Sequence, residues 1–275
     1  MTDPPAPSPA LSVLTFNLNN PSRERAERQL AWLGGRPEHL LVLTEAVPSK
    51  GCAFLAASFR DAGFAVHFPE PEAGERGVMI VSRLPVSDRQ PCVVGYLPFR
   101  AASVSIDTDG GPLDLIGLYV PSRDATPIKT ERKRRFLAAC QQAIPTGKPP
   151  HARIVMGDFN LLEPDHHPRY RFFQRFEYNF YAWLGSAGYR DAFRALHPDA
   201  EEYSWVGRTG DGYRYDHAFV SAGLAAHLTG CGYLHEPRTT RLTDHSALTL
   251  QLSVTTPTPL LVSDPTSQPE SHTLF

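Results

Sequence analysis

Polar residues that can bind metal ions or move protons stand at or near the ends of several apolar, strand-like segments of this sequence. They are Asn17, Asn19, Glu45, Tyr119, Asp158, Asn160, Asp216, Asp244 and His245. A strand end holds a side chain on a rigid support at the rim of a sheet, where polar groups from several strands can converge on one site. Acids, amides and one histidine at a common rim indicate metal-assisted phosphate chemistry.

The preferences of a hard divalent cation fit this set of residues. Mg²⁺ prefers carboxylate and amide oxygens and keeps several waters that a substrate phosphate can replace. Glu45 is the best single ligand candidate. Hydrolysis of a phosphodiester also needs a water that is held and deprotonated for in-line attack. Asp158 can take this role while Asn160 orients the water.

The remaining polar groups can hold the charge that develops in such a reaction. A phosphate oxygen that gains charge needs hydrogen-bond donors, which His245, Asn160 and Tyr119 can supply. Asp216 can accept the second N–H of His245 and so fix the imidazole in one orientation. Alone, an asparagine or aspartate at a strand end most often caps a turn. The functional interpretation therefore rests on the whole set in its order, and Asn19 is as consistent with a turn as with a site.

Short β-rich runs alternate with longer segments of helical spacing from Leu11 onward. The predicted strands span residues 11–18, 40–44, 64–68, 77–82, 101–107, 113–120, 153–156, 215–220 and 247–254. The predicted helices span residues 24–33, 53–62, 129–143, 176–187 and 191–196. Strands outnumber helices and often follow one another directly, which favours two packed sheets with helices outside over a strict βαβ repeat. The fold class is therefore α/β, as a layered sandwich.

The composition indicates one globular domain. The chain has 275 residues, of which 41% are hydrophobic and 20% charged, and these values exclude disorder or a fibre for most of its length. We expect residues 1–10, which are rich in proline, to form a disordered N-terminal tail. The domain then spans residues 11–254. Residues 255–275, where proline and hydroxyl residues replace periodicity, are predicted to be a flexible C-terminal tail.

Charge, cysteine spacing and hydropathy limit the binding partners and the cellular location that we expect for this protein. The formal net charge of −2 argues against a highly basic nucleic-acid coat protein, although a local patch can still bind phosphates. The four cysteines are scattered without a CxxC pair, so neither a zinc site nor a disulfide framework is expected. No stretch approaches 18 uninterrupted apolar residues, and the N-terminus lacks the pattern of a secretory signal. We therefore expect no membrane span, a cytoplasmic location and a monomer.

Several short motifs occur together in one order along nearly the whole chain. They are TFNLN, LTE, GVMIVSRLPV, LYVPS, GDFN, YSWVG followed by RYDHAFVS, and TDHSAL. Together they resemble the endonuclease/exonuclease/phosphatase superfamily of metal-dependent phosphohydrolases over residues 11–254. GDFN alone is a moderate signal, but GDFN followed by RxDHxxxS and a terminal DHSAL is strong. The resemblance implies a four-layered α/β sandwich with two central, mostly antiparallel sheets flanked by helices.

The resemblance also implies a role for each matching residue. Asn17 and Glu45 correspond to metal-site residues, with Glu45 the principal ligand, and Asp244 to a further metal-site acid. Asp158 and Asn160 correspond to the water-activating and phosphate-binding pair. Asp216 corresponds to the partner of the phosphate-contacting catalytic His245. The implied cofactor is Mg²⁺, or Mn²⁺ in its place.

Other features resemble the exonuclease III and abasic-endonuclease branch, which acts on DNA. Tyr119 stands where that branch carries tyrosine and several other branches carry histidine. Trp205 could form an aromatic wall near the nucleotide, and Arg123 with the basic run from Lys129 to Arg135 could line the phosphate track. We therefore expect the substrate to be contacted by Asn19, Arg123, Trp205 and Arg214. The resulting hypothesis is a DNA nuclease, either exonuclease III-like or an abasic endonuclease.

Two features favour a different substrate with the same chemistry. The branch usually carries a lysine two positions after the metal-site glutamate, where this chain has Val47, and the connection RTGDGY before Arg214 is short. A phosphatase or phosphodiesterase acting on a phosphoinositide, a sphingolipid or a small phosphate ester is therefore the alternative. A non-catalytic binding module with the same fold is the third hypothesis, although every residue of the set above is present.

Overall fold

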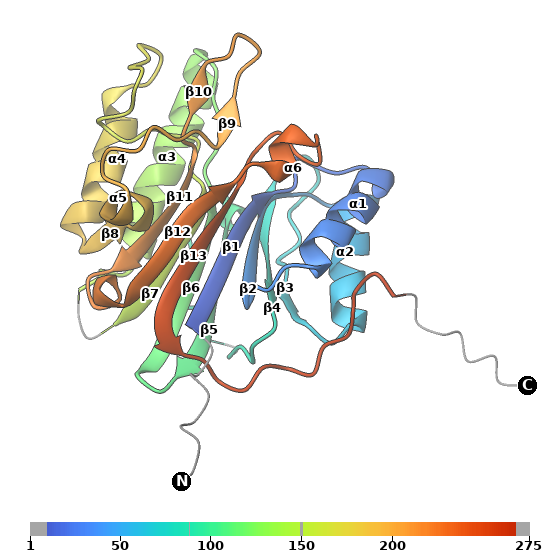
Figure 1. Ribbon diagram of the computed structural model, residues 1–275. Helices are drawn as coiled ribbons and strands as arrows, with labels where there is room; N and C mark the ends of the chain where they lie inside the picture. The colour runs from blue at the N-terminus through green and yellow to red at the C-terminus, as the bar shows by residue number, and fades with distance from the viewer. Residues whose placement is uncertain (1–9, 88, 149–150, 268–275) are drawn as a thin grey trace, which may run out of the picture.

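The computed structural model describes residues 10–87, 89–148 and 151–267, and in them two β-sheets lie face to face (Figure 1). The first sheet has six strands in the order β12-β13-β1-β2-β4-β3. Its strands are β1 (Ala10–Asn17), β2 (Leu40–Ala46), β3 (Ala65–His67), β4 (Gly77–Ser82), β12 (Leu228–Leu234) and β13 (Ala247–Thr255). The β1–β2 pair is parallel, and the other neighbours are antiparallel.

The second sheet has five strands in the order β5-β6-β7-β11-β8. They are β5 (Ala101–Thr108), β6 (Gly111–Tyr119), β7 (Ala152–Asp158), β8 (Tyr189–Asp191) and β11 (Asp216–Ser221). The β6–β7 pair is parallel and the rest are antiparallel. A separate two-stranded ribbon, β9 (Trp205–Val206) with β10 (Gly212–Tyr213), stands at one end of the sandwich (Figure 1).

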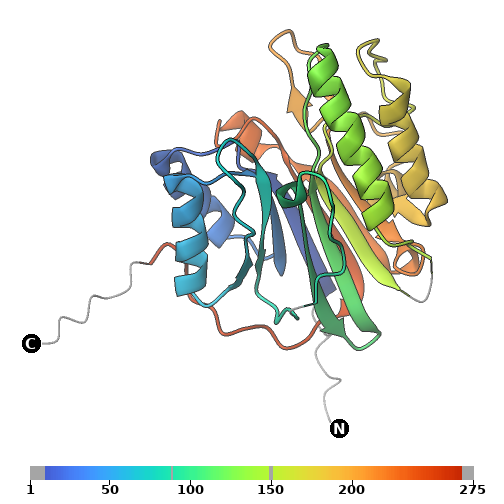
Figure 2. The same cartoon turned by 180° about the vertical axis from the view of Figure 1, so that it is seen from behind.

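Helices cover the outer face of each sheet, which completes four layers. Leu14 and Leu43 of the first sheet pack against Leu55 of α2 in one apolar cluster, and Val155 of the second packs against Phe136 of α3 in another. Figure 2 shows α3 and α4 side by side on the five-stranded sheet. The helices are α1 (Arg23–Gly34), α2 (Lys50–Asp61), α3 (Pro127–Ala143), α4 (Arg175–Ser186), α5 (Ala192–Leu196) and α6 (Glu236–Thr239). A third cluster, which includes Leu11 and Leu115, fills the space between the sheets.

Local sequence signals explain where the main helices begin. The hydroxyls of Ser22 and Ser49 accept hydrogen bonds from backbone N–H groups in the first turns of α1 and α2. Proline occupies the first turn of α3, where its missing N–H costs nothing. At the start of α4, Gln174 and Glu177 form a reciprocal capping box.

The predicted fold class is confirmed, and all nine predicted strands and five predicted helices correspond to elements of the structure within a few residues. The clearest omission is β12, a seven-residue strand at the edge of the first sheet. Its sequence, LTGCGYL, carries Gly230 and Gly232, which weaken a strand signal because glycine has no side chain to pack. Pairing with β13 supplies the stabilisation that local propensity lacks.

The C-terminal segment differs from the expected flexible tail. After β13, residues 256–267 run past the edge of the first sheet and along α1 and α2 (Figure 1). The backbone N–H groups of Leu260 and Ser263 donate to the carbonyls of Arg83 and Ala62, and Pro265 is buried against Gly34. These contacts hold the segment against the domain although its sequence has no helical or strand periodicity. Residues 268–275 and 1–9 lie outside the described part of the chain, and Ala10 already belongs to β1.

The strand register aligns the polar rim residues. Asp158, the last residue of β7, is paired with Tyr119 on β6 and with Asp216 on β11. Asn17 ends β1 in the other sheet, and Trp205 forms an isolated bridge with His245 just before β13. The candidate site therefore lies at one end of the sandwich, near the β9–β10 ribbon. Among the described residues, no helix is both long and apolar enough to span a membrane.

Gly157 makes the conformation before Asp158 feasible. Its φ of +143° is rarely adopted by residues with a side chain, and an added Cβ would lie 2.1 Å from the carbonyl oxygen of Leu118. We expect Gly157→Ala to lower the free energy of unfolding by about 3 kcal/mol, measured by urea denaturation. Gly185→Ala in α4 is the matched control, because an added Cβ there meets no atom within 4 Å. It should be neutral or slightly stabilising, and equal losses in the two variants would contradict the explanation.

Candidate active site

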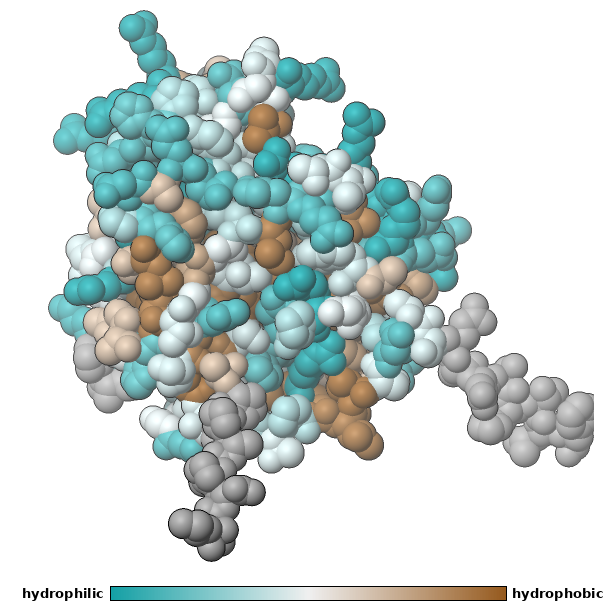
Figure 3. Space-filling view, in the orientation of Figure 1, coloured by the Kyte–Doolittle hydropathy of each residue, from teal (hydrophilic) through white to brown (hydrophobic). Residues whose placement is uncertain are grey.

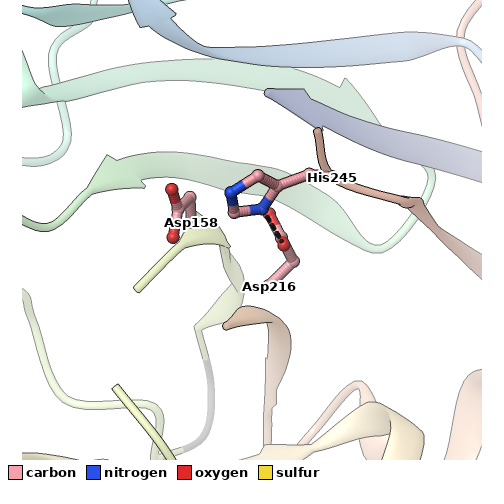
Figure 4. Close-up of side chains that lie close together, drawn as sticks. All are labelled: Asp158, Asp216 and His245. Atoms are coloured by element: carbon pink, nitrogen blue, oxygen red, sulfur yellow. Dashed lines mark hydrogen bonds and ion pairs between the residues drawn. The ribbon is translucent and has the colours of Figure 1, made fainter. Parts of the chain in front are cut away.

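A histidine between two aspartates forms the centre of the site (Figure 4). His245 Nδ1 lies 2.7 Å from Asp216 Oδ2, and Asp158 lies on the other side of the imidazole. All three side chains are buried, with at most 5% of each residue exposed. Burial alone would lower the pKa of His245, but the Asp216 and Asp158 carboxylates raise it to about 10. The imidazole is therefore held as a cation with its second nitrogen facing Asp158.

Asp158 is fixed by donors from two segments. The side-chain amides of Asn17 and Asn160 each donate to Asp158 Oδ2 at 3.0 Å, and the Asn160 backbone N–H donates to Oδ1 at 2.9 Å. Asn160 has a φ of +48°, which turns the chain back over the aspartate. Burial, and then the negative charges of Asp216 and Glu45, raise the pKa of Asp158 well above its ordinary value. The site therefore brings three carboxyl groups near one another.

Glu45 enters the site from a distortion of β2. The β2–β4 register shifts between Leu43 and Ala46, and Glu45 has a φ of +54°. Such a bulge re-aims a side chain relative to a regular strand. The Tyr119 hydroxyl donates to Glu45 Oε1 at 2.8 Å, and Arg76 Nε lies 3.3 Å from Oε2. Burial and the nearby Glu45 raise the pKa of Tyr119 well above its ordinary value, so the phenol stays protonated.

A depression of about 290 Å³ opens above these groups, and among its lining residues are Glu45, Asn160, Trp205, Asp244 and His245. Asp244 is exposed and accepts a hydrogen bond from the Trp205 indole N–H at 3.2 Å. Larger depressions of about 610 and 510 Å³ lie over α1 and α2 and beside His166. Neither contains a predicted site residue, so size alone would have misplaced the site.

An ion cluster is buried behind the depression. Lys133 of α3 lies 2.7 Å from Glu177 of α4, and Arg123 lies 2.6 Å from the same carboxylate, with no more than 1% of each side chain exposed. The Lys133 ammonium also donates to the backbone carbonyl of Asn160. Charge pairing within the protein therefore fixes the Asn160 loop from behind.

Two residues predicted to contact the substrate form ion pairs inside the protein. Arg214 is fully buried, and its guanidinium is paired with Glu163 and Asp191 at 2.7 Å each, so it cannot reach a substrate. Arg123 lines the depression, but its N–H donors are directed at Glu177 and at the carbonyls of Asp124 and Phe172. In both cases a neighbouring carboxylate, distant in sequence, takes the charge that we had assigned to phosphate binding.

The other predicted residues lie at this end of the molecule. Asn19 is half-buried with a φ of +50°, and its N–H donates to Asn17 Oδ1 at 2.7 Å, so its contacts are those of a turn. Much of the basic run on α3 is paired internally: Lys129 with Asp124, Arg132 with Glu75, and Lys133 with Glu177. It therefore offers less free charge to a phosphate track than the sequence indicated.

The sequence interpretation missed Arg76, Glu177 and Phe172. Phe172 lines the depression, whereas Arg76 and Glu177 contact Glu45 and Lys133. None belongs to a recognised motif. The one available signal was the segment RYRFFQRF, residues 169–176, in which arginines alternate with aromatic residues just before α4.

Comparison with known proteins agrees with this geometry. Residues 14–245 match the model of the Endonuclease/Exonuclease/phosphatase family. The chain belongs to this family. Family membership makes it a hydrolase that acts on phosphate esters, in a family whose enzymes depend on a divalent metal. None of the curated proteins compared with the sequence matches it significantly.

Solved structures share the fold. A 3′ phosphatase, NExo, from Neisseria bound to a product DNA hairpin superposes with a TM-score of 0.72. The 3′-5′ exonuclease NExo from Neisseria meningitidis and an AP endonuclease from Archaeoglobus fulgidus give 0.71 and 0.70. Each is 23% identical, and each alignment covers 88% of this chain and 99% of the other. At this identity the likeness establishes the fold.

The donors of the site fit a hard divalent cation. Oxygen atoms of Glu45 and Asp244 line the depression, and Asn17 lies beneath it next to Asp158. Asp158 and Asp216 bring further carboxylate oxygens close to this point. Oxygen-rich donors of this kind suit Mg²⁺ or Mn²⁺.

The buried ion pairs of Arg214 with Glu163 and Asp191, called the Arg214 cluster below, predict that the free energy of unfolding depends on pH in the acid range. Burial opposes ionisation of Glu163, but its bonds to Arg194 and Arg214 lower its pKa from 4.5 to about 2. This stabilisation is complete above pH 4.5 and is lost as the pH falls through 2. We expect Glu163→Gln to be less stable at pH 7 by about 1–3 kcal/mol and to lose less stability than the wild type between pH 4.5 and 2. Urea denaturation at several pH values measures both effects.

Asp165→Asn provides the control for this prediction. The Asp165 side chain is 96% exposed, and its nearest cationic partner, Arg169, is 3.9 Å away. Its unfolding should follow the wild-type curve at every pH. If Glu163→Gln behaves in the same way as Asp165→Asn, the buried cluster does not supply the acid-dependent stability.

Proposed function

We propose that this chain is a Mg²⁺- or Mn²⁺-dependent DNA nuclease, either exonuclease III-like or an abasic endonuclease. The observation that carries the proposal is the His245–Asp216 pair packed against the Asp158–Asn160 pair at the floor of an open depression. DNA is favoured because the solved structures of the same fold described above are a 3′ phosphatase bound to a DNA hairpin, a 3′-5′ exonuclease and an AP endonuclease. The end of the molecule that carries the β9–β10 ribbon, at the top of Figure 1, is also largely hydrophilic in the same view in Figure 3.

Each polar group then has a task in hydrolysis. Glu45, Asp244 and Asn17 would hold the metal ion, which would supply positive charge against the phosphate and the departing oxygen. Asp158, whose orientation the two asparagine amides fix, takes a proton from the attacking water. The protonated imidazole of His245 donates to the phosphate oxygens. The Asn160 amide donates to Asp158 and to the Val120 carbonyl, and so holds the loop and the carboxylate in place. The Tyr119 hydroxyl orients Glu45.

Substitutions at the centre of the site test this chemistry. Asp158→Asn removes the proton acceptor with little change of shape, and His245→Ala removes the cationic donor. We expect each to lower kcat/KM by about a thousandfold, because general-base and charge-stabilising groups contribute factors of this order. Asp109→Asn, in the exposed turn between β5 and β6, is the control and should keep wild-type activity. Near wild-type rates in both catalytic variants would reject the assignment.

The choice of substrate needs its own comparison. End-labelled duplex DNA, intact or with one abasic analogue, is incubated with the wild type and with Asp158→Asn, in Mg²⁺ and in EDTA. Metal-dependent cutting at the analogue identifies an abasic endonuclease, and stepwise loss from 3′ ends identifies an exonuclease. Turnover of bis-p-nitrophenyl phosphate with DNA untouched would support the alternative, an enzyme for lipid or small phosphate esters. The short ribbon β9–β10 is the feature that favours this alternative.

Arg76 provides a test of Glu45 as the metal ligand. Its guanidinium, 42% exposed, pairs with the carboxylate that is proposed to bind the cation. We expect Arg76→Ala to bind Mg²⁺ two- to fivefold more tightly, since a competing cation is removed and an exposed pair is worth about 0.2–1 kcal/mol. Isothermal titration calorimetry with Mg²⁺ measures the change. Arg89→Ala, which removes a similarly exposed pair with Asp114, should bind Mg²⁺ as the wild type does. Unchanged or weaker binding in Arg76→Ala would contradict this role for Glu45.

A further inference from the structure

Phe172 is an exposed aromatic residue at the edge of the candidate site. It is 44% exposed and lines the depression together with Asn160, Trp205 and His245. Single exposed apolar residues are common on protein surfaces and need no explanation of their own. Phe172 differs because a buried side chain of the protein holds both its backbone and its ring in place.

Arg123 provides this fixation. Its Nη2 donates to the Phe172 carbonyl oxygen at 2.7 Å, and the guanidinium lies 4.3 Å from the centroid of the phenyl ring. The Arg123 side chain is itself 1% exposed and paired with the fully buried Glu177. The ring therefore has one face near an anchored cation and an edge contact with Phe173, and its exposed part is available to a ligand.

The same ion cluster fixes the loop that carries Asn160. Glu177 binds Lys133, and Lys133 donates to the backbone carbonyl of Asn160. Phe172 and Asn160 are thus held on one buried network, which fixes the aromatic ring relative to the candidate site. An aromatic surface at a fixed place beside a phosphate site fits a nucleotide, whose base has a flat face for stacking.

The residues around Phe172 favour a nucleic acid over a lipid. Arg171 and Arg175 are exposed on either side of it in the sequence, and Phe173, Trp205 and Tyr215 add aromatic surface to the same depression. Cationic side chains interleaved with aromatic ones suit a polyanion with stacked bases. A lipid tail would require a continuous apolar surface instead.

We propose that Phe172 is a specificity-determining residue that stacks on the nucleobase next to the phosphate under attack. This inference rests on the proposed nuclease function and adds to it the recognition of a base at the reaction centre. The enzyme then distinguishes a nucleotide from a phosphate ester that has no base at this position.

Kinetics with single-stranded oligonucleotides test the proposal. In the wild type, replacing the base on one side of the cleaved phosphate by an abasic analogue should raise KM about tenfold, within the range for base–aromatic stacking. In Phe172→Leu the same replacement should change KM by less than about twofold, since stacking has already been lost. Phe172→Trp should restore the preference for a base. The analogue is placed in turn on each side of the cleaved phosphate, because stacking concerns one of the two.

A binding measurement reports stacking directly. An oligonucleotide carrying 2-aminopurine beside the target phosphate is titrated in Mg²⁺ with Asp158→Asn protein, which binds without cleaving. Fluorescence should be quenched with Phe172 or Trp at this position and much less quenched with Leu. Phe54→Leu on α2 is the matched control, because Arg23 covers the Phe54 ring in a similar pair away from the site. It should quench as the parent does.

The outcomes separate the two proposals. If DNA is hydrolysed and Phe172→Leu keeps both the quenching and the full preference for a base, the role of Phe172 is rejected while the nuclease function stands. If the wild type hydrolyses bis-p-nitrophenyl phosphate and no nucleic acid, the nuclease function is rejected and the role of Phe172 with it. Loss of both the preference and the quenching in Phe172→Leu, with recovery in Phe172→Trp, supports the role.

Discussion

Asp158 is a carboxylate without contact to solvent, and the arrangement of the site depends on how the protein holds it there. Removing such a group from water is costly unless hydrogen bonds and charges compensate. Here Asn17 comes from one sheet, Asn160 from the turn after β7, and His245 from the segment before β13. The two sheets must pack face to face for these donors to meet. Folding and assembly of the site are therefore the same event.

Several acidic groups gather around this carboxylate and give the site its chemical character. Asp216 accepts from His245 and holds it as a cation, while Glu45, which pairs with Arg76, adds a further carboxylate near the opening. A divalent cation is the natural complement of such a site, as in the family to which the chain belongs. Strain is concentrated in the same place, because Glu45 and Asn160 both have positive φ values. These strained conformations persist only because the surrounding contacts stabilise them by more than the strain costs.

Beside the depression, a second set of charges is paired within the protein. Lys133, Arg123 and Glu177 form a buried cluster that contacts the backbone at Asn160 and at Phe172. The Arg214 cluster likewise satisfies Glu163 and Asp191 inside the protein. These internal ion pairs explain why a basic residue near the site need not bind substrate. They act as supports for the acidic groups of the candidate site.

The sequence by itself determined the fold class, most strands and helices, and the polar residues that the structure brings together at the candidate site. It could do so because apolar periodicity is a local property, and because Asp158, Asp216 and His245 lie in motifs whose order is visible along the chain. It did not indicate β12, the packing of residues 256–267 or the internal ion pairs of Arg214. Each of these depends on partners distant in sequence: β13 for the edge strand, α1 and α2 for the C-terminal segment, and Glu163 for the arginine.

Only the tertiary structure decided which charges face a substrate. Whether an arginine binds phosphate or closes an internal ion pair depends on burial and on the position of a carboxylate many residues away. Local spacing of residues encodes neither the burial of the arginine nor the position of that carboxylate. The ion pair gains most of its energy only when the chain is compact and water is excluded. For the same reason the sequence could name His245 and Asp158, but it could not show that Phe172 and Asn160 share one buried support.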